Sequence, residues 1–151
     1  MDSLMELSEK DLAYVGGIMD GEGSISICKL KTKDTRRGFG YFLQVSVGNT
    51  NESLIDWLRI NFGGSKYFSK GSIRRGNKAL WKWALSAHKA LVFLQIIKPY
   101  LRIKSFQAEV GIAFQEAKWQ GRHITKQHWA VEETQRILMR QLNGNQKKAS
   151  G

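Results

Sequence analysis

The chain has 151 residues, of which 42% are hydrophobic, and its 24 Lys and Arg against 13 Asp and Glu residues give a formal net charge of +11. This length fits one domain with a packed core and excludes a disordered protein. The single cysteine, Cys28, excludes an internal disulfide, and together with the three histidines it does not supply four ligands at the spacing that a structural zinc site needs. The longest apolar run, residues 90–97, is interrupted by Gln95 and is too short to span a membrane, and the lone cysteine favours a reducing compartment.

The first predicted helix covers residues 9–20 and begins after Ser8, which precedes acidic residues as helix N-caps commonly do. Gly16 and Gly17 lie in its middle, where each glycine costs about 1 kcal/mol relative to alanine. Without side chains at these positions another backbone can approach closely, so the pair predicts tight packing against a second helix. A simple fit beneath the sheet of the same chain is the alternative.

A hairpin is predicted next. Residues 24–31 and 39–47 alternate between apolar and polar side chains, and the charged stretch 32–38 between them suits an exposed loop. An apolar stripe from Leu54 to Phe62 then predicts a second helix.

The same order is predicted to repeat. Residues 66–70 and 80–85 form a second hairpin, and Ser86 begins a third helix that ends at Lys98 because Pro99 follows. The sequence therefore predicts an α+β fold of αββαββα order, with four antiparallel strands and helices appended at the C-terminal end.

Two appended helices complete the prediction. The fourth helix carries an apolar stripe of Phe106, Val110, Ala113 and Ala117, and the fifth covers Lys126 to Leu142. Residues 1–142 are predicted to form a single domain, and the polar, basic residues 143–151 a disordered tail.

The helices are expected to cover one face of the sheet and to leave the other open. The alternation places on the open face Gln44, Ser46, Lys66, Phe68, Lys70 and Lys82. The first strand breaks the pattern, because Ile25 and Ile27 share their phase with Lys29 and Lys31. Either a bulge near Cys28 or a strand end that projects beyond the core would resolve the conflict.

The charge is unevenly distributed along the chain. Residues 1–23 carry one basic and six acidic residues, a net charge of −5, whereas residues 24–85 carry twelve and three, a net charge of +9, and residues 86–151 eleven and four, a net charge of +7. Such a positive field attracts polyanions, so DNA, RNA and acidic lipid are all compatible with it. A basic surface without function is the alternative.

An acidic cluster ends the first helix. Asp20 and Glu22 alternate with Gly21 and Gly23 at a helix C-terminus, where carboxylates oppose the macrodipole. A hard divalent cation such as Mg²⁺ would relieve this repulsion, and metals held by acidic groups near a duplex suit phosphodiester hydrolysis. A solvated helix end without metal is the alternative.

The stretch from Val15 to Gly23, VGGIMDGEG, resembles the nine-residue signature of the LAGLIDADG homing endonucleases, and residues 98–104 are similar to a typical segment of that family. The resemblance implies a saddle-shaped sheet in the DNA major groove and a signature helix at the interface of two units. One signature implies a homodimer acting on a long, nearly palindromic double-stranded site. The implied interface residues are Val15, Gly16, Gly17 and Met19.

The resemblance also implies site residues. Glu22 takes the place of the metal-binding catalytic acid, Gly21 offers a further ligand through its carbonyl, and Lys104 matches an active-site lysine. Asp20 is implied as a helix-end acid. Val47 stands where relatives carry a polar residue that orders water, which leaves Asn49 as a substitute or as a helix-end residue.

Together with the charge and the acidic helix end, the resemblance implies an intron-encoded, Mg²⁺-dependent DNA endonuclease, with Ca²⁺ able to bind without supporting cleavage. It is expected in the cytoplasm, or in an organelle matrix if organelle-encoded, and away from membranes. The residues expected to contact DNA are Ser26, Cys28, Lys29, Lys31, Lys33, Arg36, Arg37, Gln44, Ser46, Lys66, Phe68, Lys70, Arg74, Arg75 and Lys82. An RNA-binding intron maturase and a non-cutting DNA-binding regulator on the same fold remain alternatives.

Overall fold

A computed structural model describes residues 7–33, 37–72, 74, 76, 78–119 and 126–150. The elements follow in the order α2 (Glu9–Glu22), β1 (Gly23–Lys31), β2 (Phe39–Asn49), α3 (Glu52–Phe62), β3 (Ser65–Ser69), β4 (Leu80–Ser86), α4 (Ala87–Ile97), the 3₁₀ turn η1 (Lys98–Tyr100), α5 (Ser105–Trp119) and α6 (Lys126–Ser150). The strands form one antiparallel sheet in the order β1-β2-β4-β3. The predicted α+β class and element order are confirmed.

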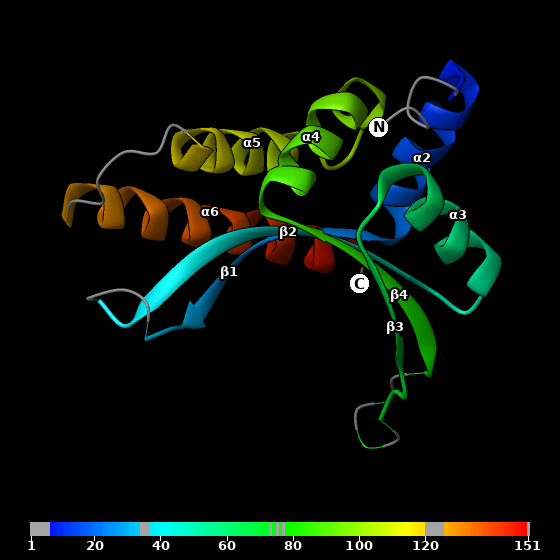
Figure 1. The fold of residues 1–151 in the computed structure, drawn as a ribbon, viewed down its shortest axis with the longest axis horizontal. Coiled ribbons are helices and arrows are strands. Elements are labelled where there is room, and N and C mark those ends of the chain that lie inside the picture. Colours follow the sequence, from blue (N-terminus) through cyan, green and yellow to red (C-terminus); the bar gives the residue numbers. More distant parts are fainter. Residues whose placement is uncertain are drawn as a thin grey trace.

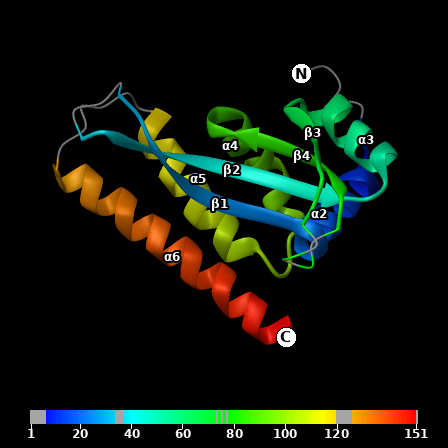
Figure 2. The same cartoon turned by 90° about the horizontal axis from the view of Figure 1, so that it is seen from below.

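The helices form a layer on one face of the sheet, and the other face is open over the described part of the chain (Figures 1 and 2). Both hairpins bend away from the helical layer, so the open face is concave (Figure 1). The core lies between the layers and includes Val15 of α2, Leu43 of β2 and Trp83 of β4, all with no exposed surface. Among the described helices none has the length and apolar character needed to cross a membrane.

The register of the first hairpin shows which face of the sheet each side chain of β1 lies on. Pairing runs without interruption from Gly23 opposite Val47 to Lys31 opposite Phe39, so the strand contains no bulge. Ile25 and Ile27 are buried, while Lys29 lies further along the same face and is exposed. A strand end that projects beyond the central core, the second of the two predicted solutions, therefore accounts for the pattern.

The predicted phase of β3 is wrong. Lys66 pairs with Trp83 and Phe68 pairs with Trp81, and directly paired residues of antiparallel strands point to the same face. Lys66 and Phe68 therefore lie on the helix-facing side, and Tyr67 shares the open face with Lys82. The short strand misled the prediction because Tyr67 and Phe68, side by side, are both aromatic.

The C-terminal helices differ from the sequence pattern. The apolar stripe of α5 does not coincide with the buried face of the helix, since Phe106 is exposed, whereas Ala108, Gly111 and Phe114 are buried together with two glutamines that hid this face from the hydrophobic pattern. Helix α6 continues to Ser150. The structure thus places residues 143–150 in a helix instead of in the predicted disordered tail, and the Asn143 side chain donates a hydrogen bond to the Ile25 carbonyl on the free edge of β1.

Candidate active site and nucleic-acid interface

Glu22 is the last residue of α2 and is exposed, directly before the first residue of β1. The Asn49 side chain, at the end of β2, donates a hydrogen bond from Nδ2 to Glu22 Oε2 at 2.7 Å. Asn49 Oδ1 in turn accepts from the Asn51 backbone N–H at 2.7 Å. This second bond fixes which way the Asn49 amide points, so Asn49 orients the Glu22 carboxylate.

The Asp20 carboxylate is engaged on both oxygens. Oδ2 accepts from the Arg102 backbone N–H at 2.8 Å, and Oδ1 accepts from the N–H groups of Ile103 and Lys104 at 3.1 Å each. These donors belong to the short segment between η1 and α5, which Asp20 thereby ties to the end of α2. The geometry therefore agrees with the helix-end role expected of Asp20.

Lys104 lies at the C-terminal end of α2. Its Nζ donates to the carbonyls of Met19 at 2.8 Å and Asp20 at 3.0 Å, where a cation offsets the negative end of the helix dipole. Burial lowers the pKa of the Lys104 ammonium, and the nearby Asp20 charge opposes that shift. Glu22 and Lys104 are thus brought to one end of one helix although they are far apart in sequence.

The donor set at this end of α2 suits a hard divalent cation. It consists of oxygen atoms, namely the exposed Glu22 carboxylate and the neighbouring main-chain carbonyl of Gly21, and Mg²⁺ and Ca²⁺ both prefer oxygen ligands. The carboxylate also stands at the negative end of a helix, where a cation is favoured. Since both oxygens of Asp20 already accept backbone hydrogen bonds, each copy of the chain offers one available carboxylate here.

The glycines of α2 divide between the two sides of the helix. A Cβ on Gly16 would lie 2.6 Å from the Tyr100 carbonyl oxygen, so Gly16 is required by η1 of the same chain. The prediction that Val15, Gly16 and Met19 form a contact between copies is wrong, because all three are buried inside the subunit. Gly17 is exposed, and a Cβ there would meet nothing within 4 Å.

The open sheet face carries small polar side chains near the centre of the molecule. Ser26 pairs with Gln44 across β1 and β2, and Ser46 pairs with Ala84 of β4. Cys28 Sγ donates to Gln44 Oε1 at 3.8 Å, and burial raises the pKa of its thiol. Ser26, Cys28, Gln44 and Ser46 therefore lie on the face predicted for them.

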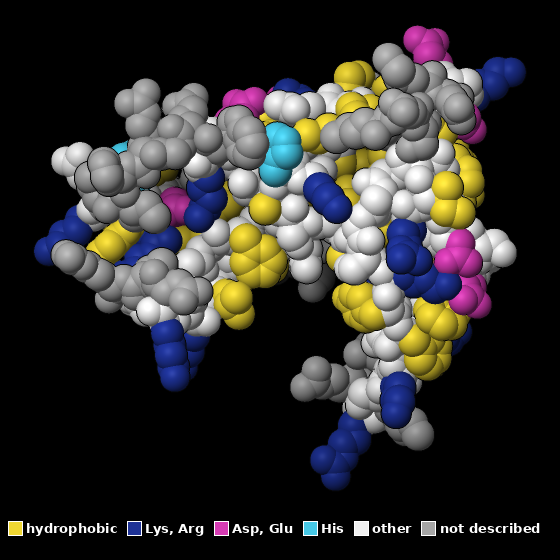
Figure 3. All heavy atoms as spheres, in the orientation of Figure 1, with side chains coloured by type: hydrophobic (Ala, Val, Ile, Leu, Met, Phe, Trp, Pro, Cys, Tyr) yellow, Lys and Arg dark blue, Asp and Glu magenta, His cyan; other side chains and the backbone are white. Residues whose placement is uncertain are grey.

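Cations gather at the ends of both hairpins, on either side of the concavity (Figure 3). On the second hairpin a hollow of about 500 Å³ is lined by Lys70, Lys78 and Lys82 together with small residues of the turn. Lys78, in the same loop as Arg74, was missing from the sequence-based set. Lys33 and Arg74 are exposed, while Arg36 and Arg75 lie outside the described residues.

Several predicted DNA contacts instead lie on the helix-facing side of the sheet. Lys29 and Lys31 share the face of Tyr41 and Phe39, and the Lys29 ammonium lies 4.4 Å from the Phe39 ring centroid. Lys66 Nζ lies 2.7 Å from Glu52 and 2.6 Å from Asp56 of α3, and 4.7 Å from the centroid of the Trp81 ring. The open-face placement of Lys66 and Phe68 is therefore corrected.

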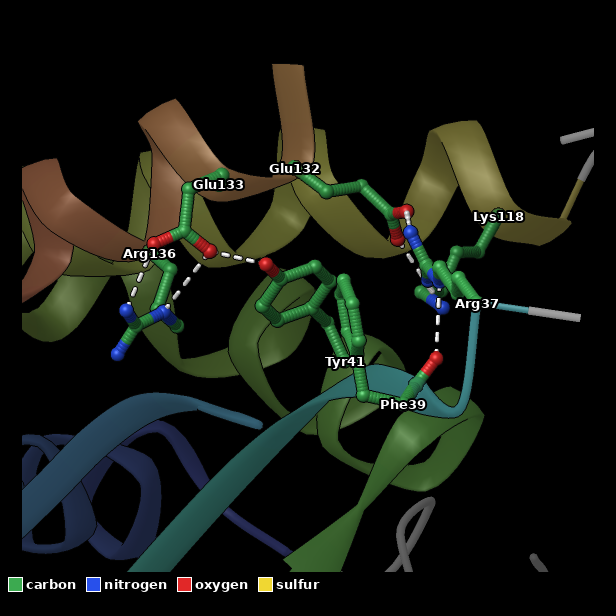
Figure 4. Close-up of polar contacts among 7 residues, drawn as sticks. All are labelled: Arg37, Phe39, Tyr41, Lys118, Glu132, Glu133 and Arg136. Carbon is green, nitrogen blue, oxygen red and sulfur yellow. Dashed lines mark hydrogen bonds and ion pairs between the residues drawn. The ribbon is translucent and has the colours of Figure 1, made fainter. Parts of the chain in front are cut away.

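Arg37 is likewise directed toward the helices (Figure 4). Its Nη1 lies 3.2 Å from Glu132 Oε1 of α6, and Lys118 of α5 lies 3.1 Å from the other oxygen of that carboxylate. In an adjacent group the Tyr41 hydroxyl donates to Glu133, which also pairs with Arg136 at 2.7 Å. Hydrogen bonds from Arg136 and Tyr41 lower the pKa of Glu133 to about 2.

A family model described as LAGLIDADG endonuclease matches residues 15–116, more than half of the chain. None of the curated protein sequences compared with the chain matches it. The archaeal intron-encoded homing endonuclease I-Vdi141I complexed with DNA is similar in structure, with a TM-score of 0.75 and 14% identity over 89% of this chain and 84% of that one.

Two further homing endonucleases have similar structures. I-TnaI gives a TM-score of 0.67 at 13% identity, with 91% of this chain and 96% of that one covered. I-CvuI, bound to the I-CreI target with Mg and with the DNA not cleaved, gives 0.63 at 15% identity, with 72% and 67% covered. Likeness at these identities shows a shared fold.

Proposed function

We propose, from the premise that this chain belongs to the LAGLIDADG endonuclease family, that it is a divalent-metal-dependent homing endonuclease that cleaves both strands of a long, nearly palindromic DNA site. The observation that carries the proposal is the end of α2, where an exposed Glu22 is oriented by Asn49 and Lys104 is held at the same helix end. I-CvuI was solved with the I-CreI target in the presence of Mg and with its own target in the presence of Ca, which supports a divalent metal.

Each residue of the site has a separate task in this proposal. Glu22, with the Gly21 carbonyl, holds the metal, and Asn49 keeps the carboxylate pointed at it. A bound divalent cation supplies an activated water and stabilises charge on the leaving oxygen. The Lys104 ammonium adds positive charge beside the scissile phosphate, and Asp20 fixes the segment that carries Lys104.

Pairing of two copies follows from the exposed side of α2. Ala13, Gly17 and Gly21 recur every four residues there, which places small side chains in one row on the helix surface. Rows of small residues allow two helices to approach closely. Two copies packed along this row would bring their Glu22 residues together at one end, and each copy would serve one strand.

The concave sheet face is the proposed DNA surface. Its centre carries Gln44, whose amide can make two hydrogen bonds with adenine, and its rim carries Lys70, Lys78 and Lys82. The three structural neighbours named above include two solved with DNA, which supports this use of the fold.

The test replaces Glu22 by Gln, which keeps the shape of the side chain and an acceptor for Asn49 but removes the charge. The parent chain first selects its site from a randomised duplex library. Because metal ions contribute several kcal/mol to such reactions, we expect E22Q to bind that site with parental affinity and to cleave at least about 100-fold more slowly.

Glu9→Gln is the matched control, since Glu9 is an exposed acid at the opposite end of the same helix. It should cleave at the parental rate in Mg²⁺. Parental cleavage by E22Q would remove the catalytic assignment, and selection of host-intron RNA with no DNA cleavage by the parent would favour a maturase.

A further inference from the structure

Arg37 is the least expected residue of the first hairpin. It lies in the loop between β1 and β2, a place where arginines are usually solvated, yet only 3% of its side chain is exposed. Its guanidinium lies 4.8, 5.2 and 5.3 Å from the ring centres of Phe39, Tyr41 and Trp129. A planar cation enclosed by aromatic rings is unavailable to a phosphate on the open face.

The cluster around Arg37 joins three parts of the chain that are distant in sequence. Arg37 Nε donates to the Phe39 carbonyl at 2.8 Å, which fixes it to β2, and its Nη1 pairs with Glu132 of α6. Lys118 of α5 pairs with the same carboxylate. The distal part of the hairpin is thereby fastened to two helices.

A second set of contacts fastens α6 along the same hairpin. The Tyr41 hydroxyl donates to Glu133, one residue after Glu132, and Figure 4 shows these two groups side by side beneath α6. Further along the helix, Asn143 Nδ2 donates to the Ile25 carbonyl at 3.0 Å. Helix α6 thus contacts β1 and β2 both near the tip of the hairpin and near its base.

The tip lies far from the proposed cleavage site. Strand β1 has nine residues between Glu22 and the tip loop, and at about 3.3 Å per residue the eight steps from its first to its last Cα atom span about 26 Å. One step of a DNA strand rises about 3.4 Å, so this distance corresponds to about eight base pairs. Side chains at the tip would reach only the outer base pairs of each half-site.

We propose that Arg37 is a positioning residue: through Glu132, α6 holds the distal β1–β2 hairpin in the curvature that lets it read the outer base pairs of each half-site. The proposal rests on the proposed function. Arg37 acts through the hairpin and does not itself contact DNA. Open-face side chains near the tip, such as Leu30 and Phe42, are the groups it positions.

Glu132→Gln separates this role from a general electrostatic one. The substitution keeps the side-chain shape and raises the net charge by one, so simple attraction to phosphates would make binding equal or tighter. If the cluster positions the hairpin, base preference at the outer positions falls instead. A wrong base pair ordinarily lowers affinity about 5- to 150-fold. In E132Q we expect a wrong base pair at an outer position to lower affinity less than about threefold.

The experiment compares the bases selected from a randomised duplex library by the parent, E132Q and the charge-matched control Glu116→Gln. Glu116 is an exposed acid of α5 whose partner, Gln95, can still donate to a glutamine. We expect E132Q alone to lose base preference at the outer positions of each half-site and to retain it at the inner positions. Unchanged outer preference, or an equal loss at all positions, would overturn the proposal.

Amide hydrogen exchange separates failure of this proposal from failure of the proposed function, since it needs no DNA. E132Q should speed exchange in β1 and β2 near the tip and leave β3 and β4 unchanged, and unchanged exchange near the tip would overturn the proposal. If E132Q loses helix content, Tyr41→Phe, which removes one hydroxyl, should give the same pattern more weakly. If the parent protein selects no DNA sequence from the library, both the proposed function and the reading of outer base pairs are overturned. The hydrogen-exchange rates of β1 and β2 would still decide whether α6 holds the hairpin in place.

Discussion

The two hairpins of the sheet are supported by the same kind of ion pair, but the supporting carboxylates lie at different separations along the sequence. On the helix-facing side each carries a cation stacked on aromatic rings and paired with helix carboxylates: Arg37 with Glu132, and Lys66 with Glu52 and Asp56. The Lys66 partners lie 14 and 10 residues away, whereas Glu132 lies 95 residues from Arg37. The short hairpin is supported by the adjoining helix, and the long one needs the C-terminal helix.

The first way to sharpen this comparison is to remove each cation. Arg37→Ala should lower the free energy of unfolding by about 3 kcal/mol, because it leaves a nearly buried carboxylate with Lys118 alone. Lys66→Ala should have a much smaller effect, because the Glu52 and Asp56 side chains are about half exposed and water screens the pairs.

Urea unfolding of the two variants and the parent measures both values. Equal losses would mean that the two hairpins depend on their cations to the same degree, which would contradict the comparison.

A smaller effect separates cations on the two faces of one hairpin. Lys82→Met should reduce the slope of log affinity against log salt concentration by about one, since it removes a proposed phosphate contact on the open face. Lys66→Met, one strand away on the opposite face, should leave the slope unchanged. Binding titrations between low and moderate salt measure the slopes, and a reduced slope for the Lys66 variant would place that residue on the DNA.

The difference between these lysines also shows which side-chain placements can be predicted from the sequence and which cannot. Alternation over the long strands correctly placed Gln44 and Ser46, because nine or more residues with one buried face determine a phase. The five residues of β3, two of them adjacent aromatics, are too few to determine which side chains face the core. The role of Arg37 was beyond prediction, because its partner comes from a helix whose docking no local pattern encodes.

Some features of the candidate site could also be predicted from the sequence, whereas others could not. The helix-end acids Asp20 and Glu22 could be located from their conflict with the helix dipole, and Lys104 from the family resemblance. That Gly16 packs on Tyr100 while Gly17 remains exposed depends on where η1 crosses α2, which a pair of adjacent glycines cannot specify. The bond from Asn49 to Glu22 likewise depends on the register of β2 beside β1.

The central claim, that two copies pair and each cuts one strand, is tested most directly with mixed dimers. The Lys104 ammonium binds the α2 carbonyls of its own chain, so each copy carries its own lysine. A dimer of one parent and one Lys104→Met chain, isolated by two different tags, is given a supercoiled plasmid that contains the selected site. We predict a nicked circle, and a linear product from the Lys98→Met control, whose lysine pairs with Glu109 on the surface. A linear product from the Lys104→Met mixed dimer at the parental rate would contradict the account.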